Sequence, residues 1–113
     1  MHMGNMAITG GMQPKNYIHI IFNNGAHDSV GGQPTVGLDI NFMAIATALG
    51  YRHAIRPENT EQLEEALQAA HQMEGPVLIE ARVRKGNRKD LGRPTTTPVQ
   101  NKEALMAFLT SKD

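Results

Sequence analysis

Three short apolar segments, separated by stretches with helical periodicity, constrain what this chain can fold into. The three segments are residues 17–24, 51–55 and 77–83. The first contains a nearly continuous run of apolar and β-branched side chains from Ile18 to Phe22, which is typical of a strand covered on both faces. Pro76 precedes the third segment and is tolerated at the start of a strand. These features predict three strands of one sheet.

Two amphipathic patterns fill the intervals between the predicted strands. Residues 41–50 place four apolar side chains at helical spacing and stop at Gly50: Phe42, Ile45, Ala46 and Leu49. Residues 59–75 carry a second stripe, which consists of Leu63, Ala66, Leu67, Ala70 and Met73. Asn59 or Thr60 can cap the start of this second helix, and Gly75-Pro76 ends it. Each helix is therefore expected to pack one face on the sheet.

Two further helices are predicted near the ends of the chain. Residues 3–13 fit a helix with Met3, Met6, Ala7 and Gly10 on one side, although its glycines make it weak alone. A last amphipathic helix is predicted to begin near Asn101 and to bury Leu105, Phe108 and Leu109. Strands that alternate with helices predict an α/β fold with a mainly parallel sheet and flanking helices. Ligands bind such sheets at the carboxyl ends of the strands.

Composition excludes several classes of function. The chain has 113 residues, enough for one small domain, and no apolar run approaches the roughly 20 residues of a membrane helix. Eleven basic residues balance eleven acidic ones, so we expect no nucleic-acid partner and no membrane partner. Cysteine is absent, which excludes disulfides, thiolate zinc sites and thiol nucleophiles, and makes a reducing cytoplasm the expected location.

The sequence Asn23-Asn24-Gly25 has two interpretations. Asn-Gly favours a two-residue hairpin turn, but no second strand with an alternating pattern follows it. The alternative is that two side-chain amides stand at the carboxyl end of a buried strand. Amide and carbonyl oxygens are hard donors that suit Mg²⁺ or Ca²⁺ and suit zinc poorly.

The following segment, 25–40, is one of two long irregular stretches, and such stretches are usually functional or disordered. His27, Asp28 and Ser29 are the residue types of a hydrolase triad, but neighbours in an extended chain point to opposite sides, so a triad is not expected. His27 or Asp28 can instead face a ligand. The four other histidines show no shared metal-ligand spacing: His2, His19, His53 and His71.

The second irregular stretch, 85–99, is basic. Six cations gather around it and the end of the last strand: Arg82, Arg84, Lys85, Arg88, Lys89 and Arg93. A solvated loop is one interpretation. A site for a small, doubly charged anion is the other, because arginine offers bidentate contacts to such groups.

Taken together, these motifs resemble a known family. The stretch "MHMGNMAITGG…KNYIHIIFNNGAHDSVGGQPT" is similar to the second half of the thiamin diphosphate fingerprint, which opens with Gly-Asp-Gly and closes on Asn-Asn. With the distal "KGNRKDLGRPTTTP", almost the whole chain resembles the thiamin-diphosphate-dependent 2-keto acid decarboxylases that act on phosphonopyruvate, with those that act on sulfopyruvate as near relatives.

This resemblance implies thiamin diphosphate and Mg²⁺ as cofactors and assigns roles by position. Asn24 matches the amide that binds the metal, and Ala26 matches the residue whose backbone carbonyl binds it, with Gly25 between them. Gly4 and Asn5 lie at the start of the helix beside the diphosphate. The segment from His27 to Thr35 matches the loop that passes the cofactor toward the substrate. We therefore expect substrate contacts, with less support, from His27, Asp28, Ser29, Gln33 and Arg93.

The resemblance also implies what the chain is part of. Gly-Asp-Gly is expected a few residues before Met1, so residues 1–113 are expected to be the C-terminal portion of the diphosphate-binding domain, inactive alone. Glu80 does not match the family's activating glutamate, and no catalytic residue is expected in this chain. The implied enzyme converts 3-phosphonopyruvate to phosphonoacetaldehyde and CO₂ as a homo-oligomer, a dimer or higher. Two alternatives are a piece of a sulfopyruvate decarboxylase subunit and a non-catalytic anion-binding or assembly module.

Overall fold

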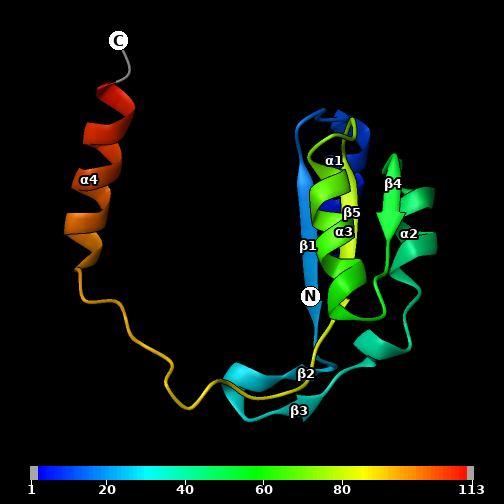
Figure 1. Cartoon of the computed structure of the whole chain (residues 1–113), viewed down its shortest axis with the longest axis horizontal. Helices are drawn as coiled ribbons and strands as arrows, with labels where there is room; N and C mark the ends of the chain where they lie inside the picture. Colours follow the sequence, from blue (N-terminus) through cyan, green and yellow to red (C-terminus); the bar gives the residue numbers. More distant parts are fainter. Residues whose placement is uncertain (1–2, 112–113) are drawn as a thin grey trace.

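The computed structural model describes residues 3–111 and has the predicted α/β architecture (Figure 1). His2, and the other terminal residues of the predicted domain, lie outside this range. Three parallel strands form the main sheet in the order β1 (Ile18–Asn23), β5 (Val77–Arg82) and β4 (His53–Ile55). The four α-helices in the described range are α1 (Gly4–Met12), α2 (Phe42–Ala48), α3 (Thr60–Ala70) and α4 (Pro98–Thr110). The prediction of a mainly parallel sheet with flanking helices is confirmed.

Strand β5 is the centre of the fold. Ile18 of β1 and His53 of β4 both lie opposite Val77, so the central strand pairs along both edges. Its side chains from Val77 to Glu80 have no exposed surface. One face of the sheet carries the cluster of Met6, Ala46, Tyr51 and Leu78, which α1 and α2 contribute to. The other carries Ala66, Ala70, Val77 and Ile79 beneath α3. The apolar run of the third predicted strand thus forms the core.

The helices between the strands follow their predicted apolar patterns, although α3 ends at Ala70 and not at Gly75-Pro76 as predicted. All four side chains of the first stripe, from Phe42 to Leu49, belong to the cluster under α2. The second stripe packs under α3, where Leu63, Leu67 and Met73 surround the buried alanines. Asn59 caps α3, since its side-chain oxygen accepts a hydrogen bond of 2.9 Å from the Gln62 backbone N–H. Of the face predicted for α1, Met6 and Gly10 are buried, whereas Met3 and Ala7 are exposed.

The prediction that the first strand is covered on both faces is wrong. β1 is an edge strand, and its alternate side chains face different surroundings. Ile18 packs against the α3 cluster, but Ile20 and Phe22 on the same face are not part of it, and Phe22 is 71% exposed. An uninterrupted apolar run therefore indicated a strand without indicating how much of it this chain covers.

The prediction that the last helix buries its apolar side chains is also wrong. Helix α4 begins at Pro98, three residues before the expected start, with Thr97 and Gln100 forming a capping box. Leu105, Phe108 and Leu109 are each more than half exposed. The cause is the extended segment that follows β5, which carries α4 away from the sheet (Figure 1). Within residues 3–111, no helix is both long and apolar enough to cross a membrane.

Candidate functional site

The turn that follows β1 brings an amide oxygen and backbone groups together at the carboxyl end of the strand. Asn24 folds back on this turn, because its Oδ1 accepts a hydrogen bond of 3.0 Å from the Ala26 backbone N–H. Gly25 has φ +64°, a conformation that side chains disfavour, and a Cβ there would lie 2.7 Å from the Leu38 side chain. The glycine is therefore needed for both its backbone angle and its close packing.

Beyond this turn lies a short hairpin that the sequence analysis did not predict. Strands β2 (Ala26–His27) and β3 (Gln33–Pro34) pair antiparallel, and Asn24-Gly25 precedes the pair and does not form its turn. The interpretation of Asn-Gly as a hairpin turn is therefore wrong. Pro34 lies opposite Ala26 and has no N–H, so the Ala26 carbonyl receives no hydrogen bond from its register partner.

Asn23 lies behind the turn and holds it against the sheet. Its side chain is buried, and Nδ2 donates hydrogen bonds of 2.7 Å to both the Gly37 carbonyl and Glu80 Oε1. Asn23 Oδ1 accepts a hydrogen bond of 3.2 Å from the Gly25 N–H. The two neighbouring asparagines thus have different roles: Asn23 is a structural side chain in the core, and Asn24 lies nearer the surface.

Glu80 is a buried carboxylate surrounded by donors. Arg56 Nε lies 2.6 Å from Oε2, and Arg82 Nε lies 3.4 Å from Oε1. Burial alone would raise the pKa of Glu80, but hydrogen bonds from Asn23 and Arg56, and the charge of Arg56, outweigh it and lower the pKa below its ordinary value. The carboxylate is therefore charged at neutral pH.

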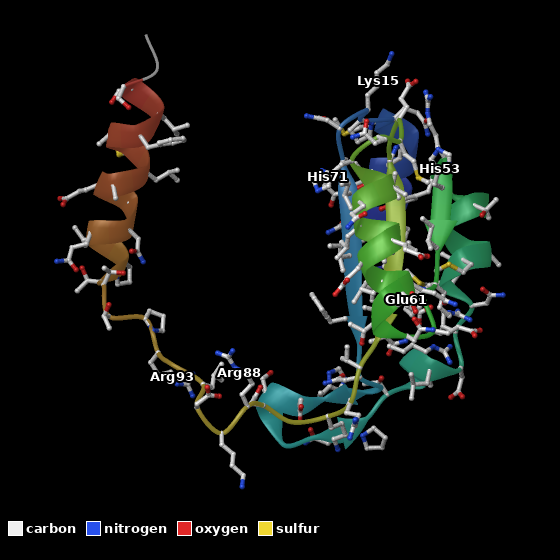
Figure 2. The ribbon with its side chains drawn as sticks, in the orientation of Figure 1. Lys15, His53, Glu61, His71, Arg88 and Arg93 are labelled. Atoms are coloured by element: carbon white, nitrogen blue, oxygen red, sulfur yellow. The ribbon has the colours of Figure 1, made fainter. Side chains whose placement is uncertain are left out.

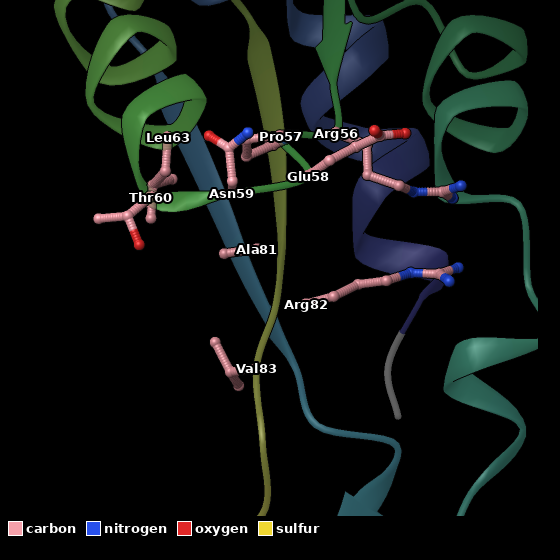
Figure 3. Close-up of a pocket in the computed structure, with 9 residues that line it drawn as sticks. All are labelled: Arg56, Pro57, Glu58, Asn59, Thr60, Leu63, Ala81, Arg82 and Val83. Atoms are coloured by element: carbon pink, nitrogen blue, oxygen red, sulfur yellow. The ribbon is translucent and has the colours of Figure 1, made fainter.

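Arg56 and Arg82 leave neighbouring strands at their carboxyl ends and extend their guanidinium groups in the same direction (Figure 3). They belong to the lining of a depression of about 570 Å³ beside the start of α3. Arg82 Nη2 donates a hydrogen bond of 3.2 Å to the Leu38 carbonyl, whereas buried Arg56 Nη2 has no hydrogen-bond partner among the described residues. Sequence reasoning missed the role of Arg56 and Glu80. The available signal was a lone glutamate within the buried apolar run of 77–83.

A second depression, of about 450 Å³, opens at the turn after β1. Its lining includes Asn24, Ala26 and His27 together with residues of the loop that follows. Residues 3–111 contain no group of three or more His, Cys, Asp or Glu side chains that could hold a metal ion. The donors at this turn are amide and carbonyl oxygens, which fit Mg²⁺ and leave further positions of its shell to other oxygen ligands. The donor chemistry thus fits the cofactor that the resemblance implies.

The other predicted site residues lie in three places. Gly4 and Asn5 begin α1, whose other end contacts Gly50 before β4, so the start of α1 faces the carboxyl ends of the strands. His27 lies on β2 and is half-buried. Ser29 and Gln33 are exposed on the hairpin, next to Asp28. No hydrogen bond joins the side chains of His27, Asp28 and Ser29 within the described range, so the structure shows no triad.

The hairpin is attached to the segment after β5. Asp28 Oδ2 accepts a hydrogen bond of 2.7 Å from the Gly86 N–H, and Lys85 Nζ donates one of 2.6 Å to the Gly32 carbonyl. Arg88 lies 3.6 Å from Asp90, and both side chains are largely exposed. Arg93 is exposed further along this segment (Figure 2). The predicted basic cluster is therefore spread along the segment, with Lys85 turned toward a backbone oxygen.

These features define a class: a parallel α/β domain with an asparagine-containing turn at the carboxyl edge of its sheet. Residues 1–81 match the family described as thiamine pyrophosphate enzyme, C-terminal TPP binding domain, where thiamine pyrophosphate is another name for thiamin diphosphate. The chain belongs to this family.

Curated relatives agree with this assignment. The chain is 36% identical to phosphonopyruvate decarboxylase of Streptomyces viridochromogenes over 98% of its own length, and 36% identical to that of Streptomyces hygroscopicus over 97%. It is also 37% identical to sulfopyruvate decarboxylase subunit beta of Methanocaldococcus jannaschii. This match covers 62% of the present chain and 37% of the length of that relative. The chain spans 28% and 27% of the length of the two phosphonopyruvate decarboxylases.

Proposed function

We propose that residues 1–113 form the C-terminal portion of the diphosphate-binding domain of a thiamin-diphosphate- and Mg²⁺-dependent decarboxylase. The reaction is conversion of 3-phosphonopyruvate to phosphonoacetaldehyde and CO₂. The observation that carries this proposal is the turn from Asn24 to Ala26 at the carboxyl end of β1, in a chain of the thiamin diphosphate-binding family. The names of two relatives that align with nearly the whole chain support the substrate.

In this proposal the chain holds the cofactor, and the cofactor supplies the electron sink for loss of CO₂. Asn24 Oδ1 and the Ala26 carbonyl bind Mg²⁺, and Gly25 gives the turn the backbone angle that it needs. Gly4 and Asn5 border the diphosphate at the start of α1, and His27 lies beside the metal-binding turn. The exposed hairpin residues Asp28, Ser29 and Gln33 face the substrate.

The proposal includes an assembly. The whole protein forms a homo-oligomer, a dimer or higher, in the cytoplasm. Exposed apolar side chains on β1 and α4, among them Phe22 and Phe108, support an assembly that covers them, and two relatives are named as subunits. The absence of cysteine from the chain supports a reducing compartment.

Decarboxylation of sulfopyruvate is the second candidate, because two relatives act on sulfopyruvate by name. The two substrates differ in the charge of their terminal anion. With the whole protein, thiamin diphosphate and Mg²⁺, we expect kcat/KM for 3-phosphonopyruvate to exceed that for sulfopyruvate by about tenfold or more, equivalent to about 1.4 kcal/mol. The measurement is aldehyde formation with each substrate. A higher kcat/KM for sulfopyruvate would identify sulfopyruvate as the substrate. Release of no CO₂ from either compound would favour a non-catalytic module.

Arg93 is the residue of this chain that we propose for contact with the phosphonate. Pro94 follows it and restricts the backbone of Arg93 to extended conformations. In the whole protein, Arg93→Ala should raise KM for 3-phosphonopyruvate by about tenfold, the loss of one charge-assisted contact, and leave KM for pyruvate almost unchanged. Steady-state kinetics with both substrates measure this difference.

Lys89→Ala is the matched control, because Lys89 is an exposed cation on the same segment. It should change neither KM by more than about twofold, within the range of an unpaired surface charge. Equal weakening of both substrates by Arg93→Ala would argue against a phosphonate contact. A smaller oligomer, measured by light scattering on the same variant, would assign Arg93 to an interface.

A further inference from the structure

Glu80 is the most deeply buried charged side chain among the described residues. It has no exposed surface and lies in the middle strand of the sheet. A buried ion pair is weak as a source of stability, because removing both charges from water costs about as much as their attraction returns. Apolar residues in place of both partners would therefore serve the packing of this strand equally well. The position of its carboxylate suggests a different role.

The Asn23 amide links Glu80 to the turn. Both hydrogens of Nδ2 are used, one toward Glu80 Oε1 and one toward the Gly37 carbonyl, each at 2.7 Å. Rotating the amide by 180° would place Oδ1 against two other oxygens, so this orientation is the stable one. In this orientation Oδ1 faces the Gly25 N–H and accepts its hydrogen bond. Glu80 thus determines which way the Asn23 amide points.

The orientation of the Asn23 amide also affects the proposed metal ligands, Asn24 and Ala26. Asn23 and Gly25 flank Asn24, and the hydrogen bond between them closes the backbone around it. Gly25 then leads into Ala26, whose N–H binds Asn24 Oδ1. With the Asn23 amide fixed, the two oxygen donors of the turn are held in place before any metal arrives. Such second-layer contacts commonly change metal affinity by about 10- to 100-fold.

We propose that Glu80 is a positioning residue for the metal-binding turn. Its carboxylate fixes the Asn23 amide, and that amide fixes the conformation from Asn23 to Ala26 in which Asn24 and the Ala26 carbonyl bind Mg²⁺. This inference rests on the proposed function, because it concerns the same metal site. It goes further by assigning a role to a residue that lies on another strand and does not contact the metal.

The test is Mg²⁺ affinity of the whole protein with thiamin diphosphate present, measured by titration calorimetry at a temperature where each variant is folded. Glu80→Met keeps a similar length but has no oxygen, so the Asn23 amide loses its acceptor on β5 and keeps only the Gly37 carbonyl. We expect its Kd for Mg²⁺ to rise about tenfold or more. Arg56→Lys is the matched control, because it keeps a cation beside Oε2 and leaves the hydrogen bond from Asn23 intact. Its Kd should stay within about twofold of the wild-type value, since the same second-layer contact is preserved.

Asn23→Ala is the second variant, in case Glu80→Met does not fold. It leaves Glu80 with both arginines and removes the acceptor for the Gly25 N–H. It should weaken Mg²⁺ binding to a similar extent. Wild-type affinity in either folded variant would overturn the inference while leaving the proposed function intact, and so would an Asn23→Ala protein that does not fold. A wild-type protein that binds no Mg²⁺ with thiamin diphosphate would overturn both.

Discussion

Asn24→Ala should weaken Mg²⁺-dependent binding of thiamin diphosphate to the whole protein by about 100-fold. The substitution removes one of the two oxygen donors at the turn after β1, and a direct metal ligand belongs at the upper end of the range seen for metal-site substitutions. Its effect on folding should be small, about 1 kcal/mol, because its one hydrogen bond is local. Cofactor titration at fixed Mg²⁺ measures the loss.

Two further measurements separate a metal ligand from a structural asparagine. Raising Mg²⁺ should partly restore cofactor binding to Asn24→Ala, because the remaining ligands still bind the ion at higher concentration. Asn87→Ala is the matched control, since Asn87 is an exposed asparagine on the segment after β5. It should bind the cofactor as the wild type does. Unchanged affinity in Asn24→Ala would remove the metal assignment.

The parts of the fold that the sequence predicted are those whose partners lie within this chain. The stripe from Leu63 to Met73 packs on β5, and the stripe from Phe42 to Leu49 packs on the opposite face. The apolar run from Val77 occupies the middle of the sheet, where both faces are covered. Periodicity reports the side on which a segment is covered, so it succeeds when the covering element is present.

The two wrong predictions, a fully covered β1 and a buried apolar face on α4, have the same cause. Ile20 and Phe22 have the composition of a strand with two covered faces, and Leu105 and Phe108 have the spacing of a packed helix. In the structure all four are exposed, because Ile20 and Phe22 are not part of the α3 cluster and the extended segment after β5 separates α4 from the sheet. Composition shows that a side chain favours burial. It does not say which surface buries it.

At the candidate site, the sequence predicted which residue stands out but not the side-chain contacts that hold it. The asparagine pair stood out because two amides at a strand end are unusual, and the fingerprint gave Asn24 a role. The role of Asn23 depends on Glu80, which is 57 residues away in the sequence, and on Gly37. No local pattern encodes such contacts. They follow from the pairing of β1 with β5. This pairing places Ile21 opposite Glu80, and Asn23 lies two residues further along β1, opposite Arg82.

The second large effect is expected at Gly10, where α1 meets the end of α2. A Cβ at this position would lie 1.8 Å from the Leu49 carbonyl oxygen and 2.7 Å from its carbon, both of which are backbone atoms. Gly10→Ala must therefore move one helix away from the other, and we expect the free energy of unfolding to fall by about 3 kcal/mol. Urea unfolding followed by circular dichroism measures the change.

Gly11→Ala is the matched control, because the next residue of the same helix has open space around its Cβ position. Helix propensity alone predicts that either alanine stabilises the protein, by up to about 1 kcal/mol. Close packing instead predicts changes of opposite sign in the free energy of unfolding: Gly11→Ala should raise it and Gly10→Ala should lower it. The difference also bears on function, because Gly4 and Asn5 begin the helix that Gly10 positions. Gly10→Ala should therefore also weaken thiamin diphosphate binding, and Gly11→Ala should not. Equal stability of the two variants would show that α1 does not approach α2 as closely as the structure places it.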